Sequence, residues 1–313
     1  MMTLRPRDFI ECDGLLGAVT SIAHPEGPVV TPRYAREGHA LRKLDTAAAR
    51  DWVATRHPEW LVDSSLLGVE VVLVPSGAIE CVHRPETRAA ALRASDALHP
   101  IEQAARRVLD ALVAQGVPSA RIGVTGSLLV GAMQAGSDID VVTYGRSTFA
   151  SARSALAALV SSGQWSALGP DDWRDAWRRR GAPGELDSYI QHERRKGTKA
   201  IASGVRLDLS LLQDEAEGVA EAPPYRKLGR RVLEARVRDA SGAFDYPARY
   251  LLAHAEVDAL VSYTATYAGQ ASVGDLVRAS GWLEEDASGA RRLLIGTSRE
   301  AEGESLTVLA PHA

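Results

Sequence analysis

The segment from residue 121 to residue 145 constrains the fold of this chain most, because it predicts two strands joined by a tight turn and a short helix. A β-branched run over residues 121–125 is typical of a strand. Gly126 permits a sharp turn and a close backbone approach. Ser127 follows where a helix over 128–133 is expected to begin. We expect the amides and the hydroxyl at this turn to hold phosphate oxygens.

Two aspartates open the next predicted strand, which covers residues 138–144. Strand side chains alternate between faces, so Asp138 and Asp140 are expected on one face, with Ile139 turned toward the core. Carboxylates held side by side repel each other unless a cation lies between them. Magnesium prefers carboxylate, phosphate and water oxygens, and manganese is an alternative. The sequence therefore predicts a divalent metal site that faces a bound phosphate.

A third carboxylate is expected from a neighbouring strand over residues 205–212. Leu207, Leu209 and Leu211 share one face of this strand, and Asp208 lies on the other face with Arg206. We predict that Asp208 completes the metal site and accepts the proton of an attacking hydroxyl.

These residues resemble the nucleotidyltransferase superfamily, which includes DNA polymerase β, CCA-adding enzymes and aminoglycoside nucleotidyltransferases. The family pattern is a hydrophobic residue, Gly, Gly or Ser, a gap, then Asp, a hydrophobic residue, Asp or Glu, and a hydrophobic residue. Residues 126–127 and 138–141 satisfy it, with Thr125 as a mild departure in the first position. The resemblance implies an α+β catalytic core, a nucleoside triphosphate substrate and catalytic, metal-binding roles for Asp138, Asp140 and Asp208.

A closer resemblance covers most of the chain and is to a group of uncharacterised predicted nucleotidyltransferases, many of them archaeal. The resemblance to that group identifies no substrate. The matching segments are residues 7–11, 24–27, the core from Gly126 to Asp140, 192–197, 263–270 and 296–301.

Basic residues are frequent between Arg174 and Lys199, just ahead of the strand with Asp208. One interpretation is a set of cations that hold the triphosphate or an anionic acceptor, with Lys196 and Lys199 as the favoured pair because Gly197 indicates a loop there. The alternative is a solvated helix face. Together with Gly126 and Ser127, these two lysines form the predicted nucleotide-binding set.

Turn-forming and linker residues along the chain predict three domains. Residues 1–95 are expected to form a small α+β domain, and residues 96–221 the nucleotidyltransferase domain. After a linker at 222–224, residues 222–313 are expected to contain a basic helix over about 225–238 and a small, mainly β barrel, with the OB fold as one candidate. A strand over 261–267 would belong to this barrel. The basic helix with Tyr263 and Tyr267 could bind RNA or DNA, or could be a surface helix above core tyrosines.

Composition limits the remaining choices. The 313 residues carry a net charge of −4, which gives no global case for nucleic-acid binding and does not exclude a local basic patch. The two cysteines cannot form a disulfide framework and suit the reducing cytoplasm. We expect no membrane segment and no signal peptide.

The predicted function is a magnesium-dependent nucleotidyltransferase that moves a nucleoside monophosphate to an acceptor hydroxyl and releases pyrophosphate. The acceptor is left open between a nucleic-acid end, a protein and a small molecule. The other class of function is a non-catalytic protein that senses a nucleotide or binds nucleic acid on the same fold.

Overall fold

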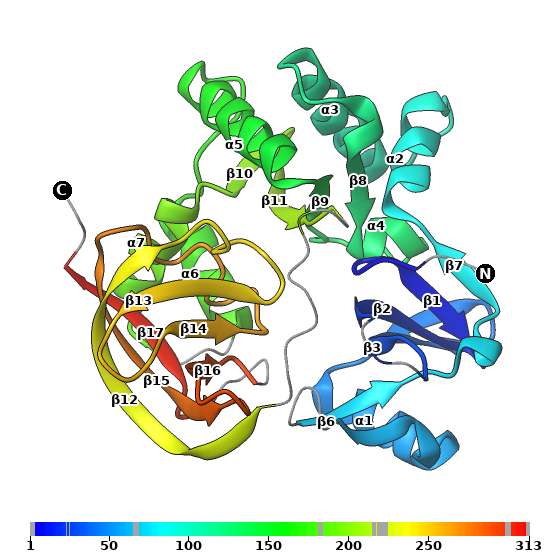
Figure 1. Ribbon diagram of the computed structural model, residues 1–313. Coiled ribbons are helices and arrows are strands. Elements are labelled where there is room, and N and C mark those ends of the chain that lie inside the picture. Colours follow the sequence, from blue (N-terminus) through cyan, green and yellow to red (C-terminus); the bar gives the residue numbers. More distant parts are fainter. Residues whose placement is uncertain are drawn as a thin grey trace. The chain divides into compact units, whose positions relative to one another are not determined.

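The structure is a computed structural model that describes residues 4–22, 24, 26–64, 69–180, 184–214, 217, 225–297 and 302–310 (Figure 1). The predicted linker at 222–224 lies outside the described residues, as do Pro25 and residues 298–301 of two segments that carry the family resemblance. The chain divides into two compact units. Unit 1 contains Met1–Ala155 and Ala202–Leu212, and unit 2 contains Leu156–Ile201 and Gln213–Ala313.

Unit 1 contains a seven-stranded N-terminal sheet with the order β5-β6-β3-β2-β1-β7, in which β4 pairs with β3. The strands are β1 (Phe9–Cys12), β2 (Leu15–Ser21), β3 (Val29–Glu37), β4 (Ala40–Lys43), β5 (Leu61–Ser64), β6 (Val69–Leu73) and β7 (Cys81–His83).

Helix α1 (Thr46–Arg56) packs Trp52 and Val53 into the core of this sheet. Asp45 is the N-cap of this helix. The Asp45 carboxylate accepts a hydrogen bond from the Ala48 amide at 2.8 Å, which satisfies one of the free amides of the first turn. Short 3-10 turns occur at η1 (Pro58–Trp60), η2 (Ser76–Ala78) and η3 (Ser119–Arg121).

The sheet that carries the aspartates has the order β10-β11-β9-β8. Its strands are β8 (Ile122–Thr125), β9 (Ile139–Tyr144), β10 (Lys199–Ala202) and β11 (Val205–Leu212). Strands β8 and β9 are antiparallel, whereas β9 and β11 are parallel. Helix α4 (Gly126–Val130) connects β8 to the turn before β9 as predicted, but it begins at Gly126 and ends at Val130 instead of covering residues 128–133.

Helices α2 (Pro85–Ala94) and α3 (Pro100–Ala114) accompany this sheet, and α5 (Arg146–Ser161) follows β9. Helix α3 buries Ala105, Val108, Leu109 and Leu112 at helical spacing. Helix α2 approaches β8 so closely that a Cβ on Gly123 would lie 2.6 Å from the Cβ of Pro85. Only glycine permits this contact.

Unit 2 contains α6 (Pro170–Arg180), α7 (Leu186–Lys196) and a five-stranded β-barrel. The barrel strands follow the order β12-β13-β14-β16-β15, and β15 pairs back with β12 to close the barrel. Strand β17 pairs with β15 outside this ring. The strands are β12 (Arg226–Asp239), β13 (Ala248–Ala253), β14 (Ala259–Ser262), β15 (Leu276–Glu285), β16 (Arg291–Ile295) and β17 (Ser305–Ala310).

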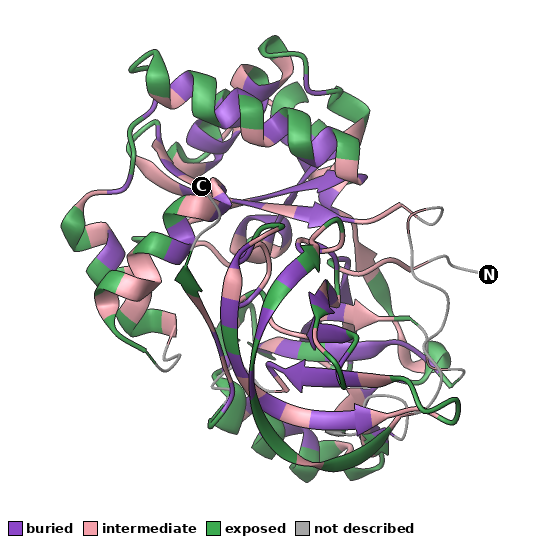
Figure 2. Ribbon diagram, turned by 60° about the vertical axis from the view of Figure 1, so that its left-hand side comes forward, coloured by how far each residue is buried: buried purple, intermediate pink, exposed green. Residues whose placement is uncertain are grey.

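The predicted basic helix over 225–238 is wrong, because these residues form strand β12. Leu233, Ala235 and Val237 are buried at alternate positions, and the residues between them are exposed. Buried and exposed positions also alternate along β13 and β15 (Figure 2). Arg, Leu and Ala favour helices locally, but ten residues of pairing with β15 override that preference.

The predicted strand over 261–267 is also too long, because β14 ends at Ser262. Tyr267 lies in the following turn and is 4% exposed, with its hydroxyl donating to the Glu304 carbonyl at 2.8 Å. The interpretation of Tyr267 as a core tyrosine is therefore confirmed. Among the described residues, no helix is long and apolar enough to cross a membrane.

Replacing Leu293 with Ala should destabilise unit 2 by about 2–5 kcal/mol, because the side chain is 0% exposed inside the barrel and its loss leaves a cavity. Chemical denaturation of the full chain measures this change. Leu309→Ala is the matched control, because Leu309 is 46% exposed and should cost no more than about 0.5 kcal/mol. Equal losses in the two variants would contradict the placement of the barrel core.

Candidate functional site

The turn between β8 and α4 requires glycine at position 126. Gly126 has a φ of +65°, a backbone angle that residues with a side chain rarely adopt. An ideal Cβ at this position would lie 2.3 Å from Oδ2 of Asp140. The Asp140 carboxylate therefore lies against the backbone of the Gly-Ser turn, and this contact joins two parts of the predicted site.

Asp140 and Asp208 are direct neighbours across the sheet. The parallel pairing of β9 with β11 puts Asp208 in register with Asp140 and Leu207 in register with Ile139. Both aspartates are half-buried, whereas Ile139 and Leu207 are 0% exposed. Because register partners point to the same face, the two carboxylates share one side of the sheet. The predicted juxtaposition of these strands is confirmed.

Asp138 lies beside Arg206 rather than inside a ring of carboxylates. The Arg206 Nε is 3.6 Å from Oδ1 of Asp138, as expected if the strand register continues by one residue. In the described part of the chain, no three His, Cys, Asp or Glu side chains gather closely enough to hold a metal ion. Sequence analysis predicted Arg206 on this face but assigned it no function. Its cation offsets the negative charge of the three aspartates.

Two hydrogen bonds from distant segments fix the turn and α4. Nε of Arg88 on α2 donates to the Leu128 carbonyl of α4 at 2.9 Å, and Arg88 also forms an ion pair with Glu102 of α3. The Thr125 hydroxyl donates to the Arg7 carbonyl at 3.4 Å. Sequence reasoning missed these contacts, because no local pattern links residues so far apart in the chain.

The N-terminal sheet reaches the surroundings of Asp140 through Tyr34 on β3. Burial raises the pKa of Tyr34, and the negative charge of Asp140 raises it further, while Arg33 opposes the shift. Tyr34 packs in one apolar cluster with Phe9, Leu16 and Leu129 of α4. The N-terminal sheet therefore forms part of the environment of the aspartates.

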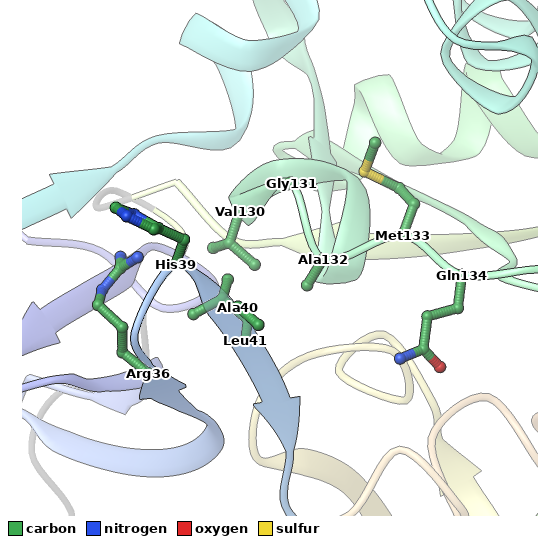
Figure 3. Close-up of a pocket in the computed structure, with 9 residues that line it drawn as sticks. All are labelled: Arg36, His39, Ala40, Leu41, Val130, Gly131, Ala132, Met133 and Gln134. Atoms are coloured by element: carbon green, nitrogen blue, oxygen red, sulfur yellow. The ribbon is translucent and has the colours of Figure 1, made fainter.

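An open hollow of about 330 Å³ lies between the β3–β4 hairpin and the residues after α4 (Figure 3). Arg36 and His39 are at one end, and Met133 and Gln134 are at the other. Between them, Leu41 and Val130 form an apolar wall with the neighbouring alanines. The sequence contained no signal for this hollow, because it depends on packing between the two sheets.

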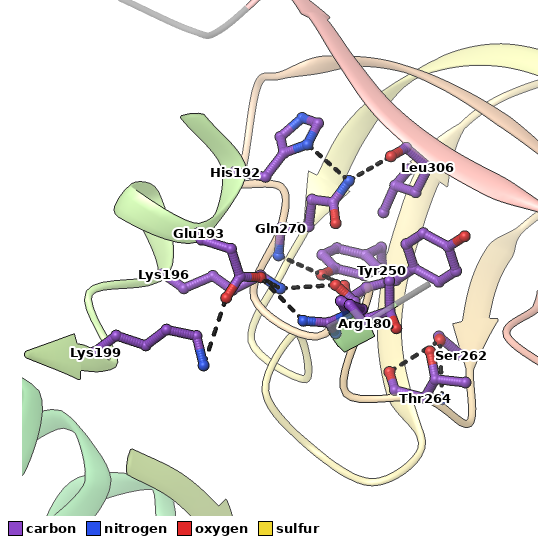
Figure 4. A network of polar contacts seen from close by, with 12 residues as sticks. Arg180, His192, Glu193, Lys196, Lys199, Tyr250, Ser262, Thr264, Gln270 and Leu306 are labelled. Atoms are coloured by element: carbon purple, nitrogen blue, oxygen red, sulfur yellow. Dashed lines mark hydrogen bonds and ion pairs between the residues drawn. The ribbon is translucent and has the colours of Figure 1, made fainter. Parts of the chain in front are cut away.

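Lys196 is enclosed within unit 2 (Figure 4). It is the last residue of α7 and not a loop residue as predicted, because the helix continues to Gly197 at the C-cap. Its Nζ donates to Oε1 of Glu193 at 2.6 Å and to the Thr266 carbonyl at 2.7 Å. Burial lowers the pKa of Lys196 to about 8, although Glu193 counteracts this shift.

Glu193 is the shared partner of three cations in this network. The Lys199 Nζ is 3.7 Å from Oε2, and Arg180 Nη1 is 3.5 Å from Oε1. Burial disfavours the charged carboxylate, but Lys196, Lys199 and Arg180 together lower the pKa of Glu193 to about 2. This arrangement gives Lys196 and Lys199 a structural partner, and their role in nucleotide binding stays a prediction.

Replacing Glu193 with Gln should destabilise the chain by roughly 3 kcal/mol at pH 7, because three buried or half-buried cations lose their carboxylate. The folded pKa of Glu193, about 2, lies below its ordinary value. Its contribution is therefore complete above pH about 4.5 and is lost as the pH falls toward 2. Urea denaturation of parent and variant across this range measures the difference. Glu234→Gln is the control, because its ion pair with Arg278 is exposed. A pH-independent difference would contradict this account.

The chain is similar along its whole length to one archaeal protein. It is 30% identical over 339 aligned residues to uncharacterized protein MJ1086 of Methanocaldococcus jannaschii, and the alignment covers 98% of this chain and 99% of that protein. No protein-family model matches the chain, and no solved structure matches it. The expected similarity to uncharacterised archaeal proteins is confirmed to this extent. The chain belongs to the family of MJ1086.

Proposed function

We propose that this protein is a magnesium- or manganese-dependent nucleotidyltransferase that transfers a nucleoside monophosphate from a triphosphate to an acceptor hydroxyl and releases pyrophosphate. The observation that carries the proposal is the pairing of Asp140 with Asp208, with Gly126 against the Asp140 carboxylate. Phosphate-binding backbone and metal-binding carboxylates then share one side of the sheet.

The strand arrangement supports this assignment. Strands β8 and β9, joined by α4, form a mixed sheet with the parallel strand β11. The nucleotidyltransferase resemblance implies a sheet of this kind. The barrel supports an OB-like assignment. Numbered along the chain, its five strands follow the order 1-2-3-5-4 around the ring. Free Cys12 and Cys81 are compatible with a cytoplasmic location, which we also propose.

The donor set fits a hard divalent cation, because all three candidate ligands are carboxylates. Asp140 and Asp208 would hold it, and Asp138 would join them after its side chain turns away from Arg206. When bound, the cation would neutralise phosphate charge and favour ionisation of the acceptor hydroxyl. Asp208 would accept the proton, and the backbone at Gly126 with the Ser127 hydroxyl would orient the phosphates. Lys196 and Lys199 are retained as additional phosphate-binding candidates.

The acceptor is proposed to be a nucleic-acid end, because small OB-like barrels commonly bind single-stranded nucleic acid. The runner-up is a protein or small-molecule acceptor. The other class of function is a non-catalytic nucleotide sensor. The ion pair between Asp138 and Arg206 favours this class, because the pair draws Asp138 away from the other two aspartates.

Replacing Asp140 or Asp208 with Asn should lower magnesium-dependent pyrophosphate release by on the order of a hundredfold or more, because each change removes a charged ligand at the reacting phosphate. Release is measured with each of the four ribonucleoside triphosphates and cell RNA, DNA, protein and metabolite fractions. Asp110→Asn on α3 is the control, because this exposed carboxylate pairs with Arg93 and lies outside the proposed site. Release at the parent rate from either site variant would refute the assignment.

Gly126→Ala should abolish pyrophosphate release while the chain stays folded, because the new Cβ displaces the Asp140 carboxylate. The positive φ adds about 1–2 kcal/mol of strain. Gly163→Ala is matched for this strain, since Gly163 has a φ of +77° and no neighbour within 4 Å of an added Cβ. Calorimetry should show similar stability losses in both variants, with activity lost only in Gly126→Ala. Full activity of Gly126→Ala would count against the contact between turn and carboxylate.

A further inference from the structure

The hollow between the β3–β4 hairpin and residues 130–134 is built on the same helix as the Gly-Ser turn. Gly126 at the start of α4 meets Asp140, and Val130 at its end lines the hollow. Four residues of α-helix rise by about 6 Å. The Ala132 amide, on the hollow wall, donates to the Ser127 carbonyl at 2.9 Å. The hollow is therefore one short helix away from the aspartates.

A second element, β3, packs against α4 beside the hollow. Tyr34 of β3 shares an apolar cluster with Leu129 of α4, and Arg36 lines the hollow two residues later. Two residues of strand span about 7 Å. Leu41 pairs directly with Arg36 across the hairpin and packs with Leu129 and Val130 in one cluster. The β3–β4 hairpin and the end of α4 therefore pack together at the hollow.

The lining combines polar and apolar groups, which suits the edge and the face of a heterocycle. Leu41, Val130 and Ala132 are half-buried and form its apolar part, and Met133 adds an adaptable thioether. The Gln134 amide can both donate and accept hydrogen bonds at a ring edge. Arg36 is exposed, and its Nε donates to Glu11 at 2.8 Å. The volume of about 330 Å³ is at the small end of the range for ligand pockets.

We propose that this hollow binds the base of the nucleoside triphosphate, so that Leu41, Val130, Ala132, Met133 and Gln134 form a base-binding site next to the phosphate site. This inference rests on the proposed function. It assigns base binding to the β3–β4 hairpin of the N-terminal sheet, together with the residues that follow α4.

The experiment compares two probes by isothermal titration in magnesium: a non-hydrolysable ATP analogue and tripolyphosphate. Tripolyphosphate contains the phosphate chain without the base. Ala132→Trp fills the hollow and should weaken binding of the ATP analogue by at least about tenfold, because the apolar contacts of the base are lost. Binding of tripolyphosphate should stay within about twofold of the parent, because the turn and aspartates are unchanged.

Ala47→Trp on α1 is the matched control, since this exposed alanine lies outside the hollow and should leave both affinities unchanged. Gln134→Trp is a second filling variant at an exposed position, where loss of folding is not expected. If the parent binds neither probe, the proposed function fails. If the parent binds both probes equally, or both filling variants bind the ATP analogue like the parent, the proposed function stands and the base site is overturned.

Discussion

Two ionised carboxylates side by side on a sheet repel each other unless positive charge lies nearby, and the pairing of β9 with β11 imposes that arrangement on Asp140 and Asp208. The core fixes the register, because slipping one strand by a residue would turn Ile139 and Leu207 out of the interior. Arg206 supplies one positive charge on this face by pairing with Asp138. The site therefore concentrates negative charge in a place where a divalent cation and a phosphate would relieve it.

A different electrostatic arrangement stabilises unit 2. There, Glu193 is the buried anion, and Lys196, Lys199 and Arg180 surround it. The Lys196 ammonium also binds the Thr266 carbonyl in the loop after β14, so α7 is attached to the barrel through a buried charge. Such a network has a structural explanation that does not require a ligand. This is why the aspartate face, and not the lysine cluster, carries the functional proposal.

The local parts of the site could be predicted from sequence. Alternation of Asp138, Ile139 and Asp140 indicated the strand and its exposed face, and Gly126 indicated the turn, because these signals lie within a few residues of one another. Contacts over long sequence separations could not be predicted. The Arg88 bond to α4 and the hollow beside Leu41 exist only once separate elements pack together.

Helix propensity was misleading where tertiary pairing decided the structure. The residues of β12 favour a helix, yet Leu233, Ala235 and Val237 already showed the period of a strand. Lys196 was expected in a loop because of Gly197, but that glycine is the C-cap that ends α7. In both cases the local signal was real, and the neighbouring elements determined its meaning.

The proposed reaction breaks the bond between the α- and β-phosphates of the nucleoside triphosphate. The most direct measurement incubates the parent protein and magnesium with triphosphates labelled either at the α- or at the γ-phosphate, in the presence of fractionated cell extract. Nucleotidyl transfer predicts that the α-label moves to an acceptor and the γ-label appears in pyrophosphate. Release of the γ-label as orthophosphate, with the α-label left in a nucleoside diphosphate, would contradict the account.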